Sequence, residues 1–240
     1  MKARLTSISL LALVALVVLG TPGCAPAGRG IVALVTDYGE IDHYRGVLAA
    51  NVLAANPRAR IAEMTHNIEP FNIMQGAFVL AESVSEFPPG TVVVAVVDPG
   101  VGTARAPIVV ETGGGRFIVG PDNGLLDLAI QREGTPRGVW RIENESLFRT
   151  GTVSSTFHGR DIFAPVGGHL SAGMSPNRVG PRVSEWVRLD IPKATRDPGG
   201  AAGTVTRIDY YGNCITNVPA MWMDEAPIGT PLTILVDGKP

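Results

Sequence analysis

Apolar runs alternate with short polar turns over most of the chain. Residues 31–36 are apolar almost throughout, and 91–97 is a second run of β-formers. Such continuous runs are typical of strands buried on both faces of a sheet. Apolar positions recur at helical spacing over 42–56 and 72–87, and Asn72 is the expected N-cap of the second helix. The alternation predicts strand–helix repeats.

The same pattern continues to about residue 173 and then changes. We therefore expect a three-layer α/β domain with a mostly parallel sheet over 31–190. From about 200 the segments are strand-like with turns between them, which predicts a partial, shortened β domain over 200–240. The other expected elements are strands at 59–64 and 139–142, a hairpin of 108–111 with 116–119, and helices at 125–131 and 162–170.

The N-terminal 24 residues read as an export signal. Lys2 and Arg4 precede an apolar stretch that is shorter than the roughly 20 residues of a membrane-spanning helix. Cys24 follows Gly23 and resembles the acylated cysteine of bacterial lipoproteins. We expect lipidation at Cys24, a tether over 25–30, and an exported protein anchored to a membrane in the periplasm or at the cell surface. Ordinary cleavage near Ala25 or an uncleaved anchor are the alternatives.

The composition gives no sign of a nucleic-acid-binding or disulfide-stabilised protein. The chain has 240 residues, a net charge of −2 and 6% aromatic residues, so neither a basic field nor a base-stacking surface indicates a nucleic-acid partner. Its two cysteines are Cys24 and Cys214, which exclude a disulfide framework if Cys24 is lipidated. Cys214 is expected to be a small core residue.

Two aspartates end apolar strands, and this is where open α/β sheets place their chemistry. Asp37 follows 31–36, and Asp98 follows 91–97. Arg105 lies seven residues after Asp98, with Gly100 and Gly102 between them. These could form a structural ion pair, but the glycines also allow the backbone to approach a ligand closely.

A second polar cluster, 155–161, reads Ser-Thr-Phe-His-Gly-Arg-Asp and makes His158 a candidate catalytic residue. His66, at another strand end, is a weaker candidate. No histidine or cysteine spacing typical of a metal site is present, so we expect no catalytic metal. Gly212-Asn213 indicates a hairpin turn, although the Asn213 amide could also contact a purine edge.

Five segments carry a resemblance to a known family. The chain resembles the S-adenosyl-L-methionine hydrolases (hydroxide adenosyltransferases), which are related to the fluorinases and chlorinases. The segments, in order, are Thr36-Asp-Tyr-Gly39, Asp98-Pro-Gly-Val-Gly-Thr-Ala-Arg105, Gly120-Pro-Asp-Asn-Gly-Leu-Leu126, Ser155-Thr-Phe-His-Gly-Arg-Asp161 and Gly212-Asn-Cys-Ile-Thr-Asn217.

The resemblance implies hydrolysis of S-adenosyl-L-methionine to adenosine and methionine, without a cofactor, by a homotrimer. It implies that Asp98, Arg105 and His158 handle the attacking water: Arg105 stabilises hydroxide character, and His158, oriented by Asp98, takes or relays the proton. Gly159 carries no hydroxyl of the kind that shapes the halide pocket of the halogenases, which favours hydrolysis. The resemblance further assigns substrate contacts to Asp37 and Phe71 at the ribose and to Asp209 and Asn213 at the methionine and adenine portions.

Two alternatives stay open from the sequence. The chain could be an exported lipoprotein that binds nucleosides without turnover, or a halogenase that uses the same sulfonium substrate. The family's C-terminal β domain contributes substrate contacts and extends beyond the point where this chain ends, so an incomplete pocket is also expected.

Overall fold

Seven strands form one mixed sheet at the centre of the protein. The computed structural model describes residues 27–197, 199–224, 229 and 233–235. The strand order is β2-β1-β3-β5-β4-β6-β7, in which the first four strands are parallel and β4 runs antiparallel between β5 and β6. The strands are β1 (Ile31–Thr36), β2 (Arg60–Thr65), β3 (Val92–Val96), β4 (Pro107–Glu111), β5 (Phe117–Pro121), β6 (Gly138–Arg141) and β7 (Arg182–Val183).

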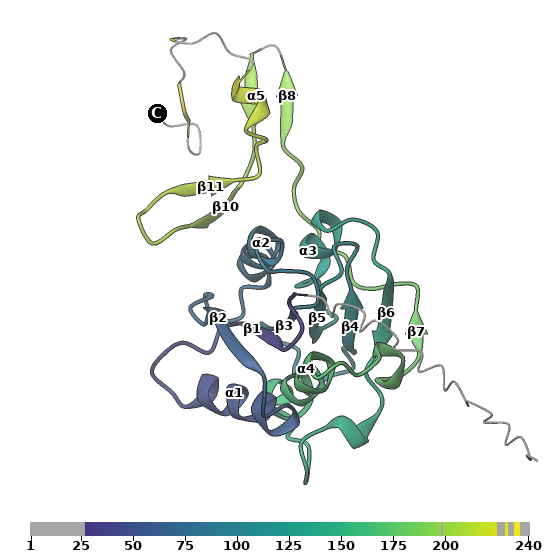
Figure 1. Ribbon diagram of the computed structural model, residues 1–240. Coiled ribbons are helices and arrows are strands. Elements are labelled where there is room, and N and C mark those ends of the chain that lie inside the picture. The colour runs from purple at the N-terminus through teal and green to yellow at the C-terminus, as the bar shows by residue number, and fades with distance from the viewer. Residues whose placement is uncertain (1–26, 198, 225–228, 230–232, 236–240) are drawn as a thin grey trace, which may run out of the picture.

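Helices cover both faces of this sheet (Figure 1). Helices α1 (Tyr44–Ala55) and α4 (Ala164–Ser171) pack on one face, and α2 (Ile73–Val84) and α3 (Asp127–Arg132) pack on the other. The side chains of β3 alternate between the two buried layers, with Val94 in one and Val93 in the other. A strand buried on both faces is therefore apolar throughout, and the expected three-layer α/β architecture is confirmed.

Local signals explain where the helices begin and how they pack. The Asn72 side chain accepts a hydrogen bond from Gln75 N at 2.9 Å, as expected for an N-cap. Gly168 lets α4 approach α1 closely, because a Cβ there would lie 2.6 Å from Val52 O. The predicted helix at 162–170 is confirmed as α4 over Ala164–Ser171, and a π-helical turn, Gly159–Phe163, leads into it. Such turns are frequent at functional sites.

Two carboxylates hold the segment after β7 against the sheet domain: Asp122 accepts a hydrogen bond from Val187 N at 2.8 Å, and the buried Asp127 accepts three. Asp127 accepts hydrogen bonds from Trp186 Nε1 at 3.1 Å, Arg188 Nη1 at 3.0 Å and Leu189 N at 3.1 Å. Two small hairpins follow, and Arg207 pairs with Glu82 of α2. The hairpins are β8 (Thr195–Asp197) with β9 (Gly200–Ala202) and β10 (Val205–Ile208) with β11 (Cys214–Thr216), and the last described helix is α5 (Met221–Asp224).

Cys214 is exposed, so the prediction that it is a core residue is wrong. It begins β11 of a two-stranded hairpin, and no second layer of the described chain covers it. The expected signal over 1–24, which includes Cys24, lies outside the described residues. Within the described part of the chain, no helix is long and apolar enough to span a membrane. The domain boundary near residue 200 stays a prediction.

Candidate active site

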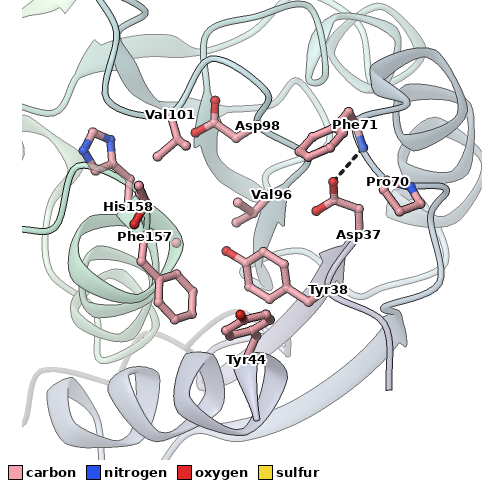
Figure 2. A pocket seen from close by; sticks show the side chains of 12 residues that line it. Asp37, Tyr38, Tyr44, Pro70, Phe71, Val96, Asp98, Val101, Phe157 and His158 are labelled. Carbon is pink, nitrogen blue, oxygen red and sulfur yellow. Dashed lines mark hydrogen bonds between the residues drawn. The ribbon is translucent and has the colours of Figure 1, made fainter. Parts of the chain in front are cut away.

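A cavity of about 380 Å³ opens at the carboxyl ends of β1 and β3. It is lined by residues that follow these strands, including Asp37 and Asp98, and by the turn that starts at His158 (Figure 2). Phe71, from the loop before α2, lies on the Asp37 side of the cavity. Parallel neighbouring strands end at the same sheet edge, so the two aspartates meet although 61 positions separate them.

Asp98, Arg105 and His158 form one hydrogen-bonded chain with the arginine in the middle. Arg105 Nε donates to Asp98 Oδ1 at 2.9 Å, and Nη2 donates to Asp98 Oδ2. The same Nη2 lies 2.8 Å from His158 Nδ1. The side chains of Asp98 and Arg105 are only 5% and 8% exposed, so this pair is shielded from water. The guanidinium also lies over the Phe163 ring, 5.2 Å from its centroid.

This order corrects one expectation. His158 is oriented by Arg105 and not directly by Asp98, because the guanidinium lies between them. A guanidinium can only donate, so His158 Nδ1 must accept and the neutral imidazole carries its proton on Nε2. Burial and the neighbouring Arg105 charge lower the pKa of His158, which favours this neutral form. His158 therefore offers a hydrogen-bond donor, not a free base, at Nε2.

Arg105 lies behind Asp98 and His158, which line the cavity themselves. Its Nη1 is buried and has no hydrogen-bond partner in the described part of the chain. A buried guanidinium N–H without a partner is costly unless a ligand or water satisfies it.

Asp37 and Phe71 are held together on the opposite wall. Phe71 N donates to Asp37 Oδ2 at 2.9 Å (Figure 2), and no other residue in the described part of the chain donates to the second carboxylate oxygen. Phe71 has a φ of 66°, the left-handed region that non-glycine residues rarely adopt. Burial raises the pKa of Asp37, and the Phe71 N–H opposes that shift. Such local strain clusters at ligand sites, where it pre-positions a group.

Three aromatic side chains form the floor of the cavity. Tyr38 contacts Tyr44 and Phe157 edge to face, with ring centroids 6.0 Å and 5.6 Å apart. Tyr44 and Phe157 also meet each other at 5.5 Å. Edge-to-face contacts of this kind fix ring orientation and bury apolar area. The cavity therefore has a rigid aromatic floor between two polar walls.

Known proteins are similar to this chain in sequence and in fold. Residues 32–180 match the SAM hydroxide adenosyltransferase N-terminal domain. The chain belongs to the SAM hydroxide adenosyltransferase family. A protein named (R)-S-adenosyl-L-methionine hydrolase from Methanocaldococcus jannaschii is 38% identical over 192 residues, which cover 78% of this chain and 66% of that protein. One of the same name from Salinispora tropica is 39% identical, with 76% of this chain and 69% of that protein covered.

A fluorinase is a more distant relative, and one solved structure has a similar fold. A fluorinase from an Actinoplanes species is 28% identical and covers 88% of this chain. The crystal structure of an uncharacterized conserved protein from Thermotoga maritima has a TM-score of 0.76 and 40% identity, covering 79% of this chain and 72% of that one. The match with the Methanocaldococcus hydrolase covers about two thirds of that protein's length.

The structure places two predicted substrate residues elsewhere. Asp209 and Asn213 lie at the turn of the β10–β11 hairpin and bond to each other, with Asn213 Nδ2 2.7 Å from Asp209 Oδ2. Neither lines the cavity of this single chain. Their substrate contacts stay predictions. His66 also lies away from the cavity lining, buried against Thr36 with Nδ1 2.8 Å from Oγ1.

Sequence reasoning missed the aromatic floor. Tyr38 directly follows Asp37 and Phe157 directly precedes His158, so both stood inside segments already singled out. Tyr44 lies within 42–56, where apolar helical spacing indicates packing and gives no sign of its place in the cavity floor. Adjacency to a predicted site residue was the available signal.

Proposed function

We propose that this chain hydrolyses S-adenosyl-L-methionine to adenosine and L-methionine. Support comes from family membership and from relatives named hydrolases at 35–39% identity, against 26–28% for the fluorinases. The observation that carries the proposal is the Asp98–Arg105–His158 chain on one wall of a cavity whose other wall holds Asp37. A ribose bound by Asp37 would present its C5′ to that chain.

The proposed reaction is an in-line displacement at the ribose C5′. A water oxygen forms a bond to C5′ while the C5′–S bond breaks, and its electron pair returns to sulfur as the neutral thioether of methionine. As the new C5′–O bond forms, the oxygen loses one proton through Asp98, which accepts its hydrogen bond, to bulk solvent, and adenosine carries the new hydroxyl. The positive sulfonium is already an activated leaving group, so positioning of the water is the main task of the protein. The proposal needs no metal or other cofactor.

Each wall of the cavity has a proposed role. Asp98, whose side chain faces the cavity, accepts a hydrogen bond from the water, and His158 Nε2 donates one to the water oxygen. Arg105 positions both groups, and its positive charge favours hydroxide character as the proton leaves. The free oxygen of Asp37 binds ribose hydroxyls, and Phe71 packs along the sugar.

A product assay tests the activity. Purified full-length protein is incubated with the sulfonium substrate in the presence of a chelator, and adenosine and methionine are quantified chromatographically. We expect the two products in equal amounts. A 5′-halo nucleoside formed in chloride or fluoride would indicate a halogenase instead. Adenosine binding by calorimetry without any turnover would indicate a receptor.

Two histidine variants distinguish a role in the site from a general effect on the fold. His158→Ala should lower kcat at least about 100-fold, because the water loses a hydrogen-bond donor and Arg105 loses an acceptor. His169→Ala is the matched control, since His169 is a partly buried histidine on α4 outside the cavity lining. Full activity of the His158→Ala protein would contradict the proposed mechanism.

Export, anchoring and assembly form a separate part of the proposal. The sequence pattern over 1–24 supports export and attachment through Cys24. Uptake of a radiolabelled lipid precursor by the wild type but not by Cys24→Ala would support it, and labelling of both would end it. The resemblance supports a homotrimer in which a neighbouring copy approaches the site. Light scattering of the purified protein measures the mass of the assembly, which should be three times that of one chain.

A further inference from the structure

The Tyr38 phenol occupies the space that a side chain at residue 159 would need. A Cβ built on Gly159 would lie 2.1 Å from Tyr38 Oη and 3.2 Å from Tyr38 Cζ. The next atom it would meet is Val96 Cγ1, at 3.5 Å. The hydroxyl thus lies against the turn that begins at His158, and Figure 2 shows the Tyr38 ring directed from the Asp37 side toward Phe157 and His158.

Packing alone does not require this hydroxyl. The ring is held by its edge-to-face contacts with Tyr44 and Phe157, which a phenylalanine would also make. Within the described residues the hydroxyl has no hydrogen-bond partner, although Tyr38 lines the cavity. Burial, and next the negative charges of Asp37 and Asp98, raise the pKa of the phenol, so it stays protonated and able to donate.

We propose that Tyr38 is a further catalytic residue, whose hydroxyl hydrogen-bonds the attacking water from the Gly159 side of the cavity. The inference rests on the proposed hydrolysis and adds a group that the Asp98–Arg105–His158 chain does not contain. Gly159 has no side chain, and the Tyr38 hydroxyl reaches the space beside it from the aromatic floor of the cavity. The phenol keeps its proton throughout and only orients the nucleophile, so the atoms and charges of the displacement are unchanged.

Removal of one oxygen atom tests this role. Tyr38→Phe keeps the ring and should lower kcat about 10- to 100-fold, while KM for the sulfonium substrate stays within about threefold. A purely structural role for Tyr38 would move neither constant in this selective way. A kcat within twofold of the wild type would overturn the inference. An inactive wild type would instead remove the proposed function, so the two failures are distinguishable.

A relocated hydroxyl gives a second, more specific test. In the Tyr38→Phe background, the Cβ of residue 159 no longer meets an oxygen at 2.1 Å, and the ring carbon at 3.2 Å has to shift by only a few tenths of an ångström. Tyr38→Phe/Gly159→Ser returns a hydroxyl to this place, whereas Tyr38→Phe/Gly159→Ala carries the same Cβ without it. The serine protein should have a kcat at least about threefold higher than the alanine protein.

Equal rates for these two proteins would contradict a role for the hydroxyl itself. Thermal unfolding followed by circular dichroism establishes that both are folded before their rates are compared. If either double variant does not fold, the Tyr38→Phe result decides by itself, because that change removes one atom and adds none.

Discussion

The buried ion pair between Asp98 and Arg105 makes a quantitative prediction about stability. Three guanidinium–carboxylate hydrogen bonds join side chains that are 5% and 8% exposed. Asp98→Asn would leave the arginine charge buried without a counterion, and Arg105→Met would do the same to the carboxylate. Each single change should therefore cost about 3–5 kcal/mol of unfolding free energy. That corresponds to a fall in Tm of roughly 6–20 °C for a domain of this size.

The double variant decides whether the pair acts as a unit. Asp98→Asn/Arg105→Met leaves neither charge unpaired, so its cost should be well below the sum of the single costs, with a coupling of about 2–3 kcal/mol. Activity should follow the same logic: each single variant should lose at least about 100-fold in kcat, and the double should be no worse than the poorer single. Urea unfolding monitored by circular dichroism, with steady-state kinetics, measures both quantities.

An exposed pair on the same sheet is the matched control. Arg141 and Glu143 approach to 3.9 Å, but each side chain is 53% exposed. The corresponding cycle of Arg141→Met and Glu143→Gln should show a coupling below about 0.5 kcal/mol, because solvent screens the charges. An additive Asp98–Arg105 cycle, or single variants that cost less than about 1 kcal/mol, would contradict the strong coupling expected of this buried pair.

Two further predictions concern Phe71 and His158. Phe71→Gly and Phe71→Ala both remove the ring and should raise KM alike. The glycine protein should be more stable by about 1 kcal/mol, because only alanine keeps the strain of a φ of 66°. Equal unfolding free energies of the two proteins would contradict this strain. The lowered pKa of His158 means that the unfolded chain binds more protons as pH falls below its ordinary value of about 6.5. The stability contributed by the neutral imidazole is therefore complete above that pH and is lost below it, and His158→Gln should flatten the slope of unfolding free energy between pH 5 and 7. An unchanged slope would show that other groups, such as His66 and His169, carry the whole pH dependence.

The fold was predictable because its signals are local. A strand with helices on both sides is apolar at nearly every position, and 31–36 and 91–97 are apolar except at Thr36 and Thr91. The N-cap at Asn72 and the hairpin of β4 with β5 are also local features. Helix ends were less well predicted, since α2 ends at Val84 and not at 87. Tertiary packing and the following Pro88-Pro89 decide such ends more than periodicity does.

The site was predictable only in part. Asp37 and Asp98 could be placed from the sequence, because parallel strands bring their carboxyl ends to one edge. The order of contacts in the Asp98–Arg105–His158 chain could not, because it depends on how the turn at 159–163 packs against that edge 53 positions away. Asp209 and Asn213 show the limit most clearly, since a hairpin motif does not encode which surface the hairpin will face.

The sequence by itself determined which residues could do chemistry here: carboxylates at strand tips, a nearby arginine, and a histidine beside a glycine. Only the tertiary structure decided that Arg105 separates Asp98 from His158, that Phe71 is strained against Asp37, and that the Tyr38 hydroxyl fills the place beside Gly159. The physical reason is that periodicity and turn chemistry act between neighbours along the chain. Hydrogen bonds and side-chain volume act between neighbours in space, and the close packing of the folded chain decides which residues are such neighbours.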